Sequence, residues 1–78
     1  MEQTPAILAS EFEALLAQND PVQLHAFLDD QNISEVAELV EGFPDEDVTI
    51  IAAMSIHRAA SVFKILDLSS QKSIIRKL

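Results

Sequence analysis

The chain has 78 residues, 49% of them hydrophobic, and a formal net charge of −8, which suits one small folded domain with a thin margin of stability. The absence of cysteine excludes disulfides and thiolate metal sites, and leaves the compartment open apart from a lean towards a reducing cytoplasm. The negative charge argues against nucleic-acid binding, because phosphate contacts require Lys and Arg.

Capping signals predict three helices in the first half of the chain. Thr4 precedes a first-turn proline and predicts a helix that ends at Asn19. Asp20 repeats this signal and opens a second helix that stops at the next Asp-Asp pair. Asn32, with a glutamate three residues later, predicts a third helix that Gly42 closes.

Three more helices are predicted in the second half. Pro44 suits a first helical turn, and the acids that follow it suit the positive end of a helix dipole. Ser55 is expected to cap a fifth helix, and Ser69 or Ser70 a sixth. The β-branched cluster at 48–51 is too short, and too close to a helix start, to predict a strand.

The segment from Ile33 to Phe43 is echoed 23 residues later in the sequence. The matching apolar pairs are Ile33 with Ile56, Val36 with Ala59, Ala37 with Ala60, Leu39 with Val62, Val40 with Phe63 and Phe43 with Leu66. Chance similarity between two amphipathic helices is the alternative. A unit this short cannot bury its own apolar face, so it packs on its neighbours, and such stacks usually serve as binding surfaces. The predicted fold is all-α: a short superhelical, solenoid-like stack of five to six helices, forming a single helical-repeat domain over 1–78.

Charge is distributed unevenly along the chain. Residues 58–78 hold all five basic residues and one of the 13 acids, Asp67, so residues 1–57 hold the other 12 acids and no Lys or Arg. The acidic part is expected to attract a cation or a basic partner, unless its acids only solvate helix faces. No apolar run approaches the roughly 20 residues that span a bilayer.

Catalytic groups are few, and they form no recognisable set. His25 has no His or acid partner at the spacing of zinc ligands, and His57 falls in a first helical turn where an exposed or capping role is expected. A single glycine excludes the usual phosphate-cradling loop. The chain is not expected to be an enzyme.

The carboxylates of Asp45, Glu46 and Asp47 are the candidate metal ligands. Mg²⁺ can be held by one or two carboxylates while it keeps several waters. The alternative needs no metal, because acids at a helix N-terminus are favoured by the helix dipole. Lys72, Arg76 and Lys77 near the C-terminus also have two interpretations. They could form a patch that binds a membrane or nucleic acid, or they could simply interact favourably with the dipole at the helix C-terminus.

Two stretches carry a family resemblance, ISEVAELVEGFPDED from Ile33 to Asp47 and RAASVFKILD from Arg58 to Asp67. Together they resemble the N-terminal cytosolic domain of the MgtE family of magnesium transporters, over about Phe12 to Leu78. In that family an acidic helix ends in Leu-Pro, and acids follow it. Next come an apolar helix, the motif Arg-Ala-Ala-Glu-Val-Leu and a closing Leu-Asp. Here Ser61 replaces the acid after the Ala-Ala pair, and the sequence stops short of the family's later repeats, CBS domains and membrane part.

The resemblance implies a right-handed superhelical stack on the cytosolic side of the membrane, as part of a longer domain or protein. Its expected function is a regulatory module of a magnesium transporter, offering an acidic surface for Mg²⁺-dependent packing against an adjacent CBS-type domain of the same or a partner chain. Contact with a membrane is expected only through a linked or partner transport domain, and a homodimer is a further option.

The alternative is a metal-independent helical-repeat module for protein–protein interaction, like the repeat domains of the flagellar motor switch protein FliG. Convergence of the three acids with Glu38 or Glu41 on one exposed face would favour magnesium. An exposed apolar face on the last helix, built on Ile74, Ile75 and Leu78, would instead predict docking to a further repeat or a second copy.

Overall fold

The computed structural model describes residues 5–78 as an all-α stack, which confirms the predicted fold class. It consists of α1 (Pro5–Gln18), α2 (Pro21–Asp30), α3 (Ile33–Gly42), the short 3₁₀ helix η1 (Pro44–Glu46), α4 (Asp47–Ala52), α5 (Ile56–Ile65) and α6 (Leu68–Lys77). No helix within this range is long and apolar enough to cross a membrane.

Local capping sets the early helix boundaries, as the sequence predicts. The side chain of Asp20 accepts hydrogen bonds from the backbone N–H groups that open α2. The side chain of Asn32 accepts one from the N–H of Glu35 at 2.8 Å and opens α3. Asn19, between α1 and α2, has a φ of 53°, a left-handed conformation that Asn tolerates better than most residues. The predicted cap Thr4 lies outside the described residues.

Two of the later caps differ from the prediction. Ser55 occupies the N-cap position of α5, but its side chain makes no capping hydrogen bond. The prediction that Ser69 or Ser70 caps α6 is wrong, because Asp67 takes that role and accepts from the N–H of Ser70 at 2.9 Å. A carboxylate interacts with the helix dipole more favourably than a hydroxyl does, and this one starts the helix earlier than predicted.

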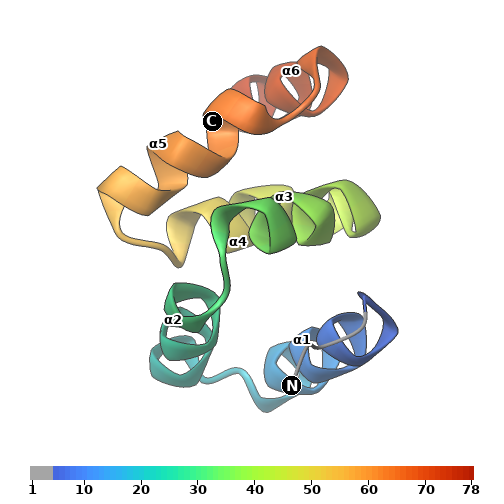
Figure 1. Ribbon diagram of the computed structural model, residues 1–78, viewed down its shortest axis with the longest axis vertical. Helices are drawn as coiled ribbons and strands as arrows, with labels where there is room; N and C mark the ends of the chain where they lie inside the picture. The colour runs from blue at the N-terminus through green and yellow to red at the C-terminus, as the bar shows by residue number, and fades with distance from the viewer. Residues whose placement is uncertain (1–4) are drawn as a thin grey trace.

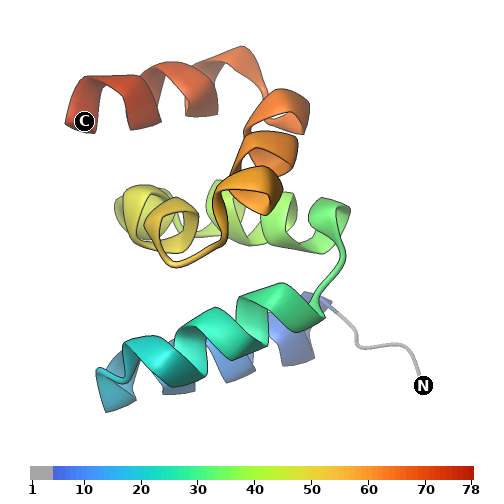
Figure 2. The same ribbon diagram turned by 90° about the vertical axis from the view of Figure 1, so that its left-hand side faces the viewer.

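The helices form three layers of two, visible in Figures 1 and 2. The pair α1 and α2 makes one end of the stack, α3 and α4 lie in the middle, and α5 and α6 make the other end. The helix α5 packs on α3, and α6 packs on α4. The pair α1 and α2 lies on the other side of α3 and α4, so the middle layer is covered from both sides. The predicted sequence repeat therefore corresponds to two helices, α3 and α5, that lie against each other.

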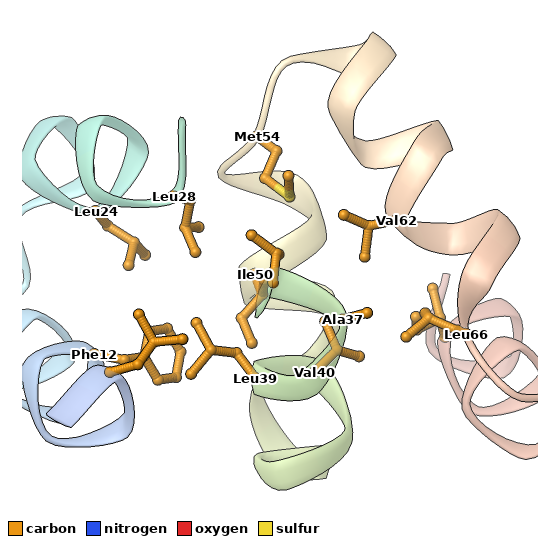
Figure 3. Close-up of a cluster of buried hydrophobic side chains, with 13 residues drawn as sticks. Phe12, Leu24, Leu28, Ala37, Leu39, Val40, Ile50, Met54, Val62 and Leu66 are labelled. Atoms are coloured by element: carbon orange, nitrogen blue, oxygen red, sulfur yellow. The ribbon is translucent and has the colours of Figure 1, made fainter. Parts of the chain in front are cut away.

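The hydrophobic core runs through all three layers (Figure 3). Leu39 of α3 points towards Phe12 of α1, whereas Ala37 and Val40 point towards α5. The ring of Phe12 meets that of Phe43 edge to face, with centroids 5.0 Å apart, a favourable geometry for aromatic pairs. The middle layer thus joins the two ends through opposite faces of one helix.

Candidate functional site

Asp47 lies at the start of α4 and forms an ion pair with the last turn of α6. Its side chain is 3% exposed, and its Oδ1 lies 2.9 Å from Nζ of Lys77. Ser73 donates to Oδ2 at 3.1 Å, and the backbone N–H of Val48 donates to Oδ1 at 2.7 Å. The ammonium of Lys77 also donates to the carbonyl oxygen of Pro44 at 2.9 Å. These bonds fasten α6 to the middle layer.

The same contacts set the ionisation of Asp47. Burial opposes the charged form, but hydrogen bonds from Lys77, Val48 and Ser73 together outweigh it and hold the pKa of the Asp47 carboxyl below its ordinary value of 3.8. The carboxylate is therefore charged at neutral pH, and its charge is balanced by a cation from the chain itself.

The three predicted magnesium ligands have different surroundings. Asp45 is exposed, Glu46 is partly buried, and Asp47 is buried in its ion pair with Lys77. Across residues 5–78, no three His, Asp or Glu side chains gather in a way that could hold a metal ion. The site at Asp45, Glu46 and Asp47, and the Mg²⁺ cofactor, stay predictions that would require ligands from another domain.

His25 has an acid partner that the sequence analysis missed. Its Nε2 lies 3.2 Å from Oδ2 of Asp29, one helical turn later, and its Nδ1 donates to the carbonyl oxygen of Ala53 at 2.6 Å. The spacing of four residues could have revealed this pair, since side chains at i and i+4 meet on a helix. The contact joins α2 to the end of α4, so it has a structural role.

Arg58 makes a second tie to the first layer. From α5 its guanidinium donates to the carbonyl oxygen of Leu28 at 2.9 Å and to that of Gln31, both at the C-terminal end of α2. Its Nε lies 3.4 Å from Oδ1 of Asp29. A cation in this position adds a charged donor to the carbonyl groups at a helix C-terminus, where the helix dipole favours positive charge.

A shallow cleft opens between α1, α2 and α4. Its lining is mostly apolar and consists of Leu15, Leu16, Asn19, Asp20, Pro21, Leu24 and Thr49. The carboxylate of Asp20 is already engaged as the cap of α2. The cleft therefore offers apolar contact and no group prepared for chemistry.

A weaker sequence similarity relates η1 and α4 to α6, at an offset of 24 residues. The segment from Pro44 to Met54 (PDEDVTIIAAM) aligns with that from Leu68 to Leu78 (LSSQKSIIRKL), with the same Ile-Ile pair in both. The middle and end layers thus share part of their apolar pattern. The two layers differ in how deeply their equivalent apolar residues are buried.

Some apolar residues of the middle layer are more buried than their equivalents in the end layer. Ile51 is partly buried, whereas its equivalent Ile75 is 62% exposed. Ala37 is 6% exposed, whereas its equivalent Ala60 lies on the surface. We call the exposed apolar residues at helical spacing on α5 and α6 the α5–α6 face; they are Ile56, Ala60, Leu68, Ile75 and Leu78.

The last helix carries part of the apolar face that would favour docking. Ile75 and Leu78 are 62% and 84% exposed, but Ile74 is buried because it packs into the core with α4.

Basic side chains border the α5–α6 face. Lys64 follows Ala60 by one helical turn, and Lys72 and Arg76 follow Leu68 by one and two turns. Side chains at such spacings lie on the same side of a helix. None of these three cations forms an ion pair or hydrogen bond within residues 5–78, in contrast to Arg58 and Lys77.

Fold and face together define an all-α helical stack with large apolar side chains exposed on α5 and α6. Comparison with models of protein families, with curated proteins and with solved structures found no match for the chain. The MgtE resemblance therefore stays a prediction from the sequence.

Proposed function

We propose that this chain is a helical-repeat module for protein–protein interaction, and that its binding surface is the α5–α6 face. The observation that carries this proposal is that three large apolar side chains of α5 and α6, those of Ile56, Leu68 and Ile75, are 80%, 64% and 62% exposed. Large apolar side chains gathered on one face of a small domain mark a binding surface or an aggregation hazard.

Site-specific photocrosslinking in cells tests this function. A photoreactive phenylalanine analogue is placed at Ile75 or Leu68, both exposed on the face, and at Glu13 on α1 as an exposed control. The two positions on the face should trap the same protein, and the control should not. The trapped protein is then purified, and its binding to the original chain and to Ile75→Glu is measured.

Loss of binding in Ile75→Glu with unchanged helicity would support the module, because Ile75 makes little contribution to the core. Crosslinking that is equal at the control position, or binding that Ile75→Glu leaves unchanged, would refute it.

We also propose the more specific setting that the MgtE resemblance suggests, a cytosolic regulatory module of a magnesium transporter. The exposed acids Glu41 and Asp45 support this setting, since they lie close together in sequence at the end of α3 and the start of η1. Carboxylates on facing surfaces repel each other unless a divalent cation bridges them. Because Lys77 neutralises Asp47, the magnesium contact would fall to Asp45 and Glu46, with the remaining ligands from a CBS-type domain.

An NMR titration with Mg²⁺ tests this setting, with Na⁺ at matched ionic strength to subtract screening. Saturable shifts around Asp45 and Glu46 should be lost in Asp45→Asn/Glu46→Gln. The matched control Glu13→Gln/Asp30→Asn removes the same charge from α1 and α2 and should keep them. Shifts that are uniform and non-saturating, with a transporter CBS domain present, would refute the magnesium role and leave the interaction module intact.

A further inference from the structure

We infer that the α5–α6 face takes an amphipathic helix whose apolar side is flanked by Asp and Glu. This inference rests on the proposed interaction function and specifies its partner. The apolar residues supply the contact, and the cations at their border select the charge of the partner.

The cations at the border are unpaired in the part of the chain that the structure describes. Lys64, Lys72 and Arg76 are exposed and make no ion pair within residues 5–78, although the protein carries a net charge of −8. An interface gains specificity and association rate when potentials of opposite sign meet. A partner that places carboxylates beside its apolar side chains would meet these unpaired cations as it buries the face.

The repeat itself shows that the sign of charge changes at this end. Glu35 and Glu41 of α3 correspond to Arg58 and Lys64 of α5. Between layers, bases of a later layer meet acids of an earlier one, as with Lys77 and Asp47. If a further layer also placed basic side chains against the layer before it, those side chains would face the basic residues of α5 and α6, and like charges repel. The partner must therefore carry the opposite charge.

A second copy of the chain fits the face poorly. Two α6 helices packed against each other would bring Lys72 and Arg76 near their own counterparts, which costs free energy. The acidic end, α1 and α2, has the right charge, but its apolar cleft is shallow and its large apolar side chains are mostly covered. Within residues 8–54, Val22 is the one large apolar side chain that is exposed. An anionic membrane would repel a body with this net charge, so a protein helix is favoured.

Binding of designed peptides tests the inference. Three helical peptides share one Leu- and Ile-rich face and differ only in the flanking residues, which are Glu, Gln or Lys. Fluorescence anisotropy measures their affinity for the full chain. The Glu peptide should bind tightest and the Lys peptide weakest.

Matched variants separate local charge from net charge. Lys72→Gln/Arg76→Gln and Gln18→Glu/Gln23→Glu each lower the net charge by two, the first at the face and the second on α1 and α2, at the other end. The first should weaken binding of the Glu peptide by roughly two- to thirty-fold, the range for two exposed ion pairs, and the second should weaken it by less than about twofold.

The other outcomes would overturn the acidic partner, the interaction module or the choice of a protein helix as the occupant of the face. Equal binding of all three peptides, abolished by Ile75→Glu, would overturn the acidic partner and keep the interaction module. No binding of any peptide, together with no specific crosslink at Ile75, would overturn both. Self-association that Ile75→Glu removes would identify a second copy as the occupant. Binding to phosphatidylserine vesicles, lost in Ile75→Glu and without peptide binding, would identify a membrane.

Discussion

Replacing Lys77 by methionine should destabilise the domain by about 1–2 kcal/mol at pH 7. Methionine keeps an apolar stem but leaves the carboxylate of Asp47, 3% exposed, without its cationic partner. Removal of one partner from a fully buried pair costs about 3–5 kcal/mol, and an exposed pair contributes about 0–1 kcal/mol. The Lys77 side chain is 43% exposed, so water screens the pair and the expected loss lies between these limits.

Urea denaturation followed by circular dichroism measures this loss. Lys72→Met is the matched control, because it removes an exposed lysine of the same helix that has no ion-pair partner within residues 5–78, and it should change stability by less than about 0.5 kcal/mol. Equal stability of Lys77→Met and Lys72→Met would refute the argument that the Asp47 pair fastens α6. A double-mutant cycle with Asp47→Asn then isolates the coupling between the two side chains.

The same pair predicts a pH dependence with a definite sign. The pKa of Asp47 is lower in the folded state than its ordinary value of 3.8, so its ionised form stabilises the fold above about pH 4. That contribution is lost as the pH falls through the folded-state pKa. The difference in unfolding free energy between the original chain and Lys77→Met should therefore be largest near pH 7 and shrink towards pH 2. A difference that stays constant over this range would contradict the assignment.

Three further predictions concern contacts within the stack, each measured by the same urea assay. Arg58→Met should destabilise by about 2 kcal/mol, because the carbonyl oxygens at the end of α2 lose a charged donor, whereas the exposed control Lys64→Met should lie within about 0.5 kcal/mol of the original chain. Asn32→Ala should cost about 1 kcal/mol through loss of the cap of α3, and Asn32→Gly only a few tenths; equal losses would exclude capping as the cause. Asn19→Ala should cost about 1 kcal/mol because φ is 53°, while Asn19→Gly should be nearly neutral, and the reverse order would show that the turn adopts another conformation.

The parts of the fold that depend on neighbouring residues were predictable from the sequence. Asp20 and Asn32 cap helices because their side chains reach N–H groups two or three residues away. Such contacts depend only on neighbouring residues, so the residue types at these positions are enough to predict them. The end of α3 at Gly42 and the pairing of α3 with α5 followed from composition and from the repeat. The start of α6 was misplaced because several capping residues compete there, and Asp67 has the stronger side chain.

The candidate site was harder to predict because its contacts join distant parts of the chain. Lys77 and Asp47 are 30 residues apart, and no sequence pattern shows that a lysine at the end of α6 will neutralise one of three neighbouring acids. The exposed face could be anticipated at Ile75 and Leu78 from helical spacing. Ile74 could not be separated from them, because its burial depends on how α6 rotates against α4.

The uneven cover of the three layers also predicts how the molecule opens. The middle layer has neighbours on both sides, whereas α5 and α6 rest on one neighbour only. Helices of about ten residues are marginal alone, so the end layer should fray at a lower free energy than α3. Amide hydrogens of α5 and α6 would then exchange faster than those of α3. A ligand that covers the end would slow this exchange first, so the exchange profile reports when the face is occupied, whatever occupies it.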